Sequence, residues 1–196
     1  MGTQVSTHTT LLARLADGSD RSAWGEFHER YGELVRRFAG GRGLQPADCD
    51  DVVQEVLLAL TRAMHSFEYD PTKGSFRAYL KTVTIHSVSR VIRKNHPAPA
   101  LVTVADAVEP GAEDESVAAA WEAEWRANHV RRAMRLLESE FKVAELRVFQ
   151  RYAVDGEGAR ETAAALGLTV NQVYQAKSRI TKRLAELIEL QVQDEG

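Results

Sequence analysis

The chain has 196 residues, with 25 Lys and Arg against 28 Asp and Glu, so its formal net charge is −3. Hydrophobic residues make up 44% and charged residues 27%, a balance that excludes a disordered or fibrous protein. No apolar run reaches the roughly 20 residues of a membrane-spanning helix, and the N-terminal stretch lacks the basic flank and apolar core of a secretory signal. The single cysteine, Cys49, allows no internal disulfide. Together these features predict a soluble cytoplasmic protein of one domain or two small ones.

Helical periodicity predicts an all-α fold. Apolar residues recur at helical spacing over residues 20–39. Gly40, Gly41 and Gly43 then end that helix, because glycine tolerates the left-handed conformation of a helix terminus. No segment alternates polar and apolar residues with period two over a useful length, so no strand is expected.

Two further helices are expected before residue 97. Asp48 or Asp50 is expected to cap the first of them. Its buried stripe consists of Val52, Val53, Val56, Leu57, Leu60 and Met64. Turn residues predict a loop over 66–74, and Ser75 is expected to cap a third helix that ends before Pro97.

A flexible acidic linker is expected to divide the chain into two small helical domains. Three prolines and a glycine fall within residues 97–117, and helical periodicity resumes at Trp121. We therefore expect domains at 1–96 and 118–196, with a turn inside the second one at 155–158.

Charge is strongly segregated along the chain. Residues 71–105 contain no acid but six bases: Lys73, Arg77, Lys81, Arg90, Arg93 and Lys94. Residues 95–125 contain no base but seven acids: Asp106, Glu109, Glu113, Asp114, Glu115, Glu122 and Glu124. A second acid-free stretch, 162–185, carries Lys177, Arg179, Lys182 and Arg183. Such stretches are either solvated helix faces or contacts for phosphates, and two of them flanking an acidic connector favour two separate nucleic-acid contacts.

Residues 160–173 have the spacing of a helix-turn-helix. Ala163 is small where two helices must cross closely, and Gly167, four residues later, can adopt the left-handed turn. Val173, six residues further on, packs the second helix onto the first. The alternative to a DNA-binding motif is an ordinary helical hairpin whose polar face is only solvated.

The second helix of this motif presents a polar, acid-free face. Thr169 and Gln172 form a T-x-x-Q capping box, which places the helix start at about Val170. The residues of the predicted DNA-reading face are Asn171, Gln172, Tyr174, Gln175, Lys177, Ser178, Arg179, Lys182 and Arg183. In this motif the N-terminal part of the second helix lies in the major groove, where Asn and Gln can pair with adenine and Arg can read guanine or bind phosphate.

Two segments and the helix-turn-helix together resemble bacterial sigma factors. Residues 48–60, DCDDVVQEVLLAL, resemble the D-A-E-D-x-V-Q-E-x-F helix of that family. Residues 67–80, FEYDPTKGSFRAYL, resemble its F-D-P-x-x-G-S-F-R-A-W-L segment, and the helix-turn-helix resembles its fourth conserved region. Similarity runs from about residue 10 to residue 190, with only a linker between the two parts. This short layout is similar to the extracytoplasmic-function (ECF) group of the sigma-70 family, which keeps only the second and fourth regions.

The resemblance implies a docking helix for core RNA polymerase. By this resemblance, the polymerase-binding positions of the family's helix correspond to Asp48, Asp50, Asp51, Gln54 and Glu55. Acidic and amide groups at i, i+3 and i+4 share one helix face, which suits a basic partner surface. The same aspartates also favour a helix N-terminus through the macrodipole, so both roles remain open.

The resemblance also implies two DNA elements. The loop 66–74 and the helix after it would recognise and melt the minus-ten element with Tyr69, Lys73, Arg77, Tyr79, Lys81, Arg90, Arg93 and Lys94. Phe67 and Tyr79 are equally candidates for the core. The helix-turn-helix would read the minus-thirty-five element, and the acidic linker would lie in the polymerase cleft or serve as a solvated tether.

Five positions depart from the family pattern. Tyr79 replaces the usual Trp, Cys49 the usual Ala, and Thr162 the usual Ile of the motif's first helix. Ala176 stands where many relatives carry Arg in the recognition helix, which predicts an unusual contacted promoter sequence. Gly158 replaces an apolar residue and predicts a looser turn before the motif.

No catalytic, metal-binding or cofactor-binding motif is present, so we expect neither an enzyme nor a bound cofactor. The expected partners are core RNA polymerase, promoter DNA and an anti-sigma factor, without membrane insertion. One rival is a helix-turn-helix regulator that binds duplex DNA alone, as a dimer. A helical adaptor that binds only protein is the other, and it leaves the acid-free faces unexplained.

Overall fold

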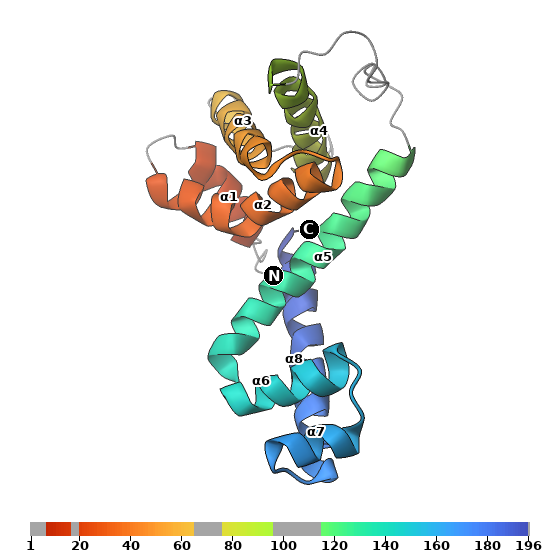
Figure 1. Cartoon of the computed structure of the whole chain (residues 1–196). Helices are drawn as coiled ribbons and strands as arrows, with labels where there is room; N and C mark the ends of the chain where they lie inside the picture. Colours follow the sequence, from red (N-terminus) through yellow and green to blue (C-terminus); the bar gives the residue numbers. More distant parts are fainter. Residues whose placement is uncertain (1–6, 17–19, 65–75, 96–114, 196) are drawn as a thin grey trace. The chain divides into compact units, whose positions relative to one another are not determined.

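The computed structural model (Figure 1) describes residues 7–16, 20–64, 76–95 and 115–195. Throughout these ranges the chain folds into helices joined by turns, with no strand, which confirms the predicted all-α fold. Two compact units can be distinguished. The first consists of residues 1–128 and 194–196, and the second of residues 129–193.

Four helices and the start of a fifth build the first unit. They are α1 (Thr7–Ala16), α2 (Arg21–Gly41), α3 (Pro46–Met64), α4 (Phe76–Asn95) and the first half of α5 (Glu115–Glu140). Asp20 caps α2, because its Oδ1 accepts a hydrogen bond of 3.0 Å from the Ala23 amide. Gly43, with φ of +86°, follows the end of α2, as the glycine cluster predicted.

Helix α3 begins three residues earlier than a capping Asp48 would place it, and five earlier than a capping Asp50 would. Its first residue is Pro46, a position where a missing amide hydrogen costs nothing and a fixed φ favours the helix. Asp48 therefore lies inside the first turn and Asp50 beyond it, so neither caps the helix. Both carboxylates still lie near the positive end of the helix dipole.

Aromatic side chains from three helices pack together in the core of the first unit. Phe27 and Tyr31 of α2 contact Phe76 of α4, with ring centroids 6.0 and 5.9 Å apart. Trp125 of α5 stacks on Tyr31 at 5.9 Å, and Trp121, fully buried, contacts Trp125 at 5.8 Å. The first half of α5 thus belongs to this core, and α3 packs beside α4 (Figure 1).

Short helices and one long helix form the second unit. They are the second half of α5, α6 (Val143–Phe149), the π-helical turn η2 (Gln150–Val154), α7 (Ala159–Leu166) and α8 (Val170–Glu195). One cluster of its core consists of Ala133, Leu137, Phe149, Ile180 and Leu187. A second cluster joins α7 to α8 and consists of Val148, Ala163, Val173 and Ala176.

None of the described helices is both long and apolar enough to cross a membrane.

Two leucines on α3 provide a matched test of this packing. Leu60 is fully buried and Leu58 is 49% exposed. Leu60→Ala is expected to lower the free energy of unfolding by about 2–5 kcal/mol, because it leaves a cavity between packed helices. Leu58→Ala should change it by no more than about 0.5 kcal/mol. Urea denaturation followed by circular dichroism measures both, and equal losses would contradict the observed orientation of α3.

Candidate functional site

The predicted polymerase-binding residues lie on α3 but differ in exposure. Asp50, Asp51 and Gln54 are exposed, and Glu55 is half-buried. Asp48 is only 9% exposed. The surface available to a large partner therefore centres on Asp51, Gln54 and Glu55, with Leu58 one turn further along the helix.

Most of these carboxylates already have partners within the first unit. The amide Nδ2 of Asn95, the last residue of α4, donates to Asp48 Oδ1 at 2.8 Å and to Asp51 Oδ2 at 3.2 Å. Asp50 forms an ion pair with Arg36 of α2. Since exposed pairs of this kind contribute little stability, a basic partner surface can replace them at small cost.

Arg90 of α4 and Glu55 of α3 form an ion pair with an N–O distance of 3.0 Å. Glu55 is a predicted polymerase contact and Arg90 a predicted DNA contact. The Arg90 side chain is 60% exposed, which leaves it accessible to a phosphate. This salt bridge therefore joins a predicted polymerase contact to a predicted DNA contact.

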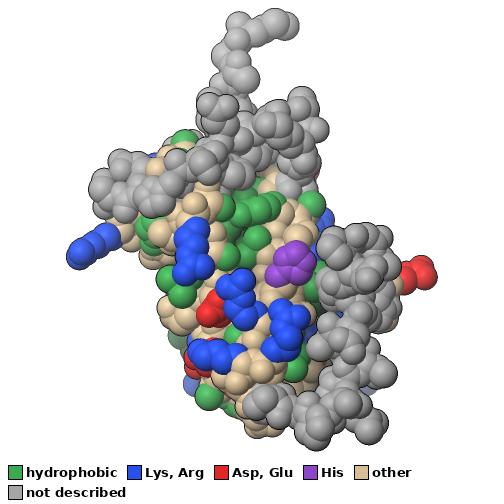
Figure 2. Space-filling model, turned by 90° about the horizontal axis from the view of Figure 1, so that it is seen from above, with side chains coloured by type: hydrophobic (Ala, Val, Ile, Leu, Met, Phe, Trp, Pro, Cys, Tyr) green, Lys and Arg blue, Asp and Glu red, His purple; other side chains and the backbone are tan. Residues whose placement is uncertain are grey.

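The outer face of α4 is basic toward its C-terminal end. Arg90, Arg93 and Lys94 are exposed, and Lys81 is half-buried. Figure 2, a view of one face of the molecule, shows Lys and Arg side chains gathered beside a histidine, with hydrophobic side chains next to them. Tyr79 is half-buried against the core, and this burial raises the pKa of its phenol. The Tyr79 ring therefore packs against the core and also leaves part of its surface open to solvent.

Arg77 faces α5 and is held there by two side chains. Its guanidinium forms an ion pair with Glu122 and lies 4.9 Å from the ring centroid of Trp125. The family resemblance predicts that Arg77 contacts DNA, and the observed contacts give it a second, structural role in joining α4 to α5. A phosphate would have to compete with both partners.

Three aromatic or basic candidates, Phe67, Tyr69 and Lys73, and the expected cap Ser75 lie outside the described residues. Two contacts of the site were missed from the sequence. Asn95 was not singled out, and Glu122 was named only as one of the acids of residues 95–125, because each contact spans more than 40 residues of chain.

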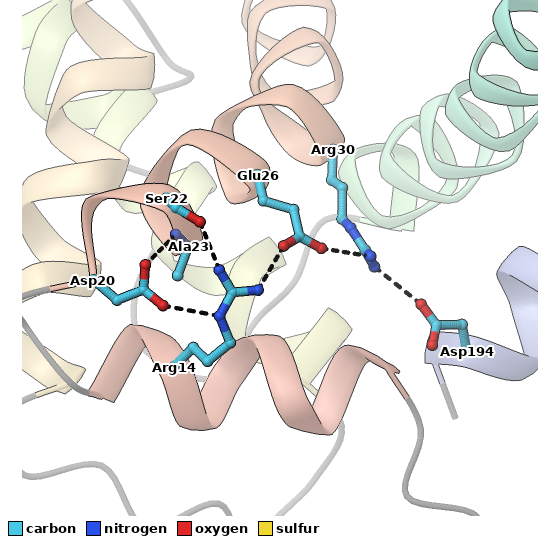
Figure 3. Close-up of polar contacts among 7 residues, drawn as sticks. All are labelled: Arg14, Asp20, Ser22, Ala23, Glu26, Arg30 and Asp194. Atoms are coloured by element: carbon cyan, nitrogen blue, oxygen red, sulfur yellow. Dashed lines mark hydrogen bonds and ion pairs between the residues drawn. The ribbon is translucent and has the colours of Figure 1, made fainter.

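Two arginines of the first unit that are not predicted DNA contacts, Arg14 and Arg30, form a connected series of ion pairs (Figure 3). Arg14 of α1 donates to Asp20 at 2.9 Å and to Glu26 at 2.8 Å. Arg30 donates to Glu26 at 2.7 Å and to Asp194 at 3.0 Å. The hydrogen bond from Arg14 lowers the pKa of the Asp20 carboxyl, which also caps α2. Both arginines are thus occupied in holding helices together.

The helix-turn-helix has the predicted local geometry. Gly167 ends α7 in the left-handed conformation, with φ of +66°. The amide of Thr169 donates to Gln172 Oε1 at 2.8 Å, and the amide of Gln172 donates to Thr169 Oγ1 at 3.2 Å. Helix α8 begins at Val170, so the predicted capping box and its position are confirmed. Gly158 precedes α7 in an extended conformation that other residues also adopt.

The predicted DNA-reading face of α8 is exposed. Its exposed members are Asn171, Gln172, Tyr174, Gln175, Lys177, Ser178, Arg179 and Lys182, and Arg183 is half-buried. Ala176 does not belong to this face. Only 4% of it is exposed, and it packs with Ala163 and Val173. The Ala176 side chain therefore offers no contact to a base, and the unusual promoter sequence inferred from its replacement of Arg stays a prediction.

Both arginines of this face are paired with carboxylates. Arg179 pairs with Glu145 of α6. Arg183 binds Glu140 of α5 through two nitrogens, at 2.6 and 2.9 Å, and reaches Glu186 at 3.2 Å. These hydrogen bonds lower the pKa of the Glu140 carboxyl. Lys177 and Lys182 have no ion-pair partner within the described residues, so they are the more available cations.

Among the described residues, His, Cys, Asp and Glu form no group of three or more that could hold a metal ion.

Removal of the Arg183 guanidinium tests the pairing on α8. Arg183→Ala is expected to raise the pKa of Glu140 toward its ordinary value, because the hydrogen bonds that favour the charged carboxylate are lost. NMR titration of the glutamate side chains measures the shift. Arg179→Ala is the control, since Arg179 pairs with a different glutamate. An unchanged Glu140 midpoint in Arg183→Ala would contradict the pairing.

Comparisons with known proteins match this arrangement to one family. The sequence model of Sigma-70 region 2 matches residues 27–97, which include all of α3 and α4. The ECF RNA polymerase sigma factor SigM of Mycobacterium tuberculosis is 26% identical over 189 residues, covering 95% of this chain and 87% of SigM. The RNA polymerase sigma factor CnrH of Cupriavidus metallidurans is 28% identical, covering 91% and 93%.

A solved structure of CnrH in complex with the cytosolic domain of CnrY is also similar, with 23% identity, a TM-score of 0.36, and coverage of 91% of this chain and 96% of that one. The region 2 match and the relatives along nearly the whole chain agree with the sequence resemblance. The chain thus contains a Sigma-70 region 2 segment, and along nearly its whole length it is similar to ECF sigma factors of the sigma-70 family.

Proposed function

We propose that this chain is an ECF sigma factor, which divides promoter recognition between its two units and docks on core RNA polymerase through α3. In this proposal the exposed face of α3 around Asp51, Gln54 and Glu55 binds a basic polymerase surface. The docking and minus-ten contacts would come from residues 1–96 and the minus-thirty-five contacts from residues 118–196, with 97–117 as the linker. Within the second of these ranges, residues 118–128 pack with the first unit, so the minus-thirty-five contacts would come from the remainder.

One observation carries the proposal most directly. The segment that matches Sigma-70 region 2 carries exposed acids on α3 and exposed bases on α4. A single helical unit with both faces can bind a basic protein surface and a phosphate backbone at the same time. Neither a plain regulator nor an adaptor needs both.

The minus-ten contacts would come from α4 and the loop before it. Arg93 and Lys94 are exposed and, within the described residues, unpaired, so they can bind phosphates directly. Arg90 can do so once Glu55 releases it. Tyr69 and Lys73 complete this set by family resemblance alone.

The minus-thirty-five contacts would come from the start of α8. Asn171 and Gln175 are exposed one turn apart, which suits two neighbouring bases in the major groove. Lys177 and Lys182 would bind phosphates and fix the orientation of the helix.

Bond formation in transcription would then belong to the polymerase, and this chain would select the promoter and help to open it. We place the chain in the cytoplasm, where polymerase and promoter meet. An anti-sigma factor is an expected partner from the family.

Charge reversal on α3 tests the docking face. Asp51→Arg with Glu55→Arg is expected to weaken binding to core RNA polymerase by at least about tenfold, because two attractive charges become repulsive. Fluorescence anisotropy of the labelled chain titrated with polymerase measures the dissociation constant. Glu29→Arg with Glu138→Arg changes the net charge equally on exposed residues elsewhere and serves as the matched control.

Thermal unfolding should show both double variants folded at the assay temperature. Equal binding by wild type and the α3 variant would overturn the docking face. If wild type fails to bind polymerase yet shifts duplex DNA alone as a dimer, the helix-turn-helix regulator replaces the sigma function.

Alanine substitutions on α8 test base reading. In a selection of promoters from a random library by the holoenzyme, Asn171→Ala with Gln175→Ala is expected to relax the upstream element and leave the minus-ten preference intact. Each lost bidentate contact removes about 1–3 kcal/mol of discrimination. Gln193→Ala removes an exposed amide near the other end of the same helix and should select the wild-type sequences. Unchanged upstream sequences in the double variant would contradict the assignment.

A further inference from the structure

The amide of Asn95 links the end of α4 to the acidic face of α3. Its Nδ2 donates to Asp48 Oδ1 at 2.8 Å and to Asp51 Oδ2 at 3.2 Å. The two aspartates are one helical turn apart, so a single amide with two hydrogens can satisfy both. Of the two carboxylates, Asp48 is 9% exposed and Asp51 is exposed.

The linking group is neutral, and this distinguishes it from the salt bridge between Arg90 and Glu55. Arg90 holds Glu55 through a salt bridge of 3.0 Å, which cancels the charge of that carboxylate. Asn95 orients Asp51 without cancelling its charge. A fixed, uncancelled carboxylate is preorganised for a basic partner, because its rotamer is set before binding.

We propose that Asn95 is a positioning residue for polymerase docking: it holds the Asp51 carboxylate in place on the surface of α3. The inference rests on the proposed docking face and adds to it a residue that the family motif does not contain. Asn95 itself need not touch polymerase.

The largely buried Asp48 explains why Asn95 orients Asp51. Asp48 lies in the first turn of α3, where the helix dipole favours a carboxylate. Its hydrogen bond with Asn95 anchors the amide at the less exposed side, so the second hydrogen points toward Asp51. Of Asn95 and the two aspartates that it binds, Asp51 is therefore the carboxylate whose orientation affects the binding of a partner.

A double-mutant cycle separates positioning from general stabilisation. Wild type, Asn95→Ala, Asp51→Ala and the combined variant are titrated with core RNA polymerase. Asn95→Ala is expected to weaken binding about threefold to tenfold in the wild-type background. In the Asp51→Ala background the same change should have less than about a twofold effect, since the group to be positioned is gone.

Two further variants of the chain make the test more specific. Asn95→Lys keeps a donor but places a positive charge beside Asp51, and it should weaken binding and make it less sensitive to salt. Gln193→Ala removes an exposed amide elsewhere and should bind as wild type. Thermal midpoints are compared, and all titrations are made well below the lowest one.

The outcomes distinguish this inference from the docking proposal. If Asp51→Ala weakens binding and Asn95→Ala does not, the positioning role falls and the docking face stands. The positioning role also falls if Asn95→Ala weakens binding equally in both backgrounds, because the effect then does not pass through Asp51. If Asp51→Ala binds as wild type, the positioning role falls, and the docking face falls with it only if the double charge-reversal variant also binds as wild type.

Discussion

The packing of α3 against α4 is the contact on which the first unit depends. Leu60 of α3 and Leu80 of α4 are both fully buried in the same core, with α2 and the start of α5 around them. Burial of one face of each helix leaves the opposite face to solvent, and these faces carry acids on α3 and bases on α4. The apolar contact thus decides which charged residues can meet a partner.

A second theme is that several predicted DNA-contacting arginines have a carboxylate partner in the free chain. Arg77 pairs with Glu122, Arg90 with Glu55, and Arg183 with Glu140. Pairs that are partly exposed contribute little net stability, so phosphates can replace the carboxylates. In the proposed DNA contacts this exchange would cost some free energy for each arginine, which would disfavour weak, nonspecific contact with DNA. Lysines without such partners carry no such cost.

Local signals explain what the sequence predicted well. The capping box at Thr169 and the left-handed Gly167 depend on residues close in sequence, and both are confirmed. Asp48 and Asp50 were wrong as caps because Pro46 begins the helix first. Contacts across long stretches of chain, such as Asn95 with Asp48, left no periodic signal. The roles of the predicted site residues remain predictions, and part of that set lies outside the described residues.

The burial of Ala176 was available in the sequence, since it follows Val173 by three residues and precedes Ile180 by four, on one helix face. This position limits how the specificity of α8 can evolve or be engineered. A larger side chain at 176 would push α7 and α8 apart, because Ala163 lies in the same tight cluster. Libraries aimed at new promoters should therefore vary Asn171, Gln175 and Ser178, and leave the alanine as part of the scaffold.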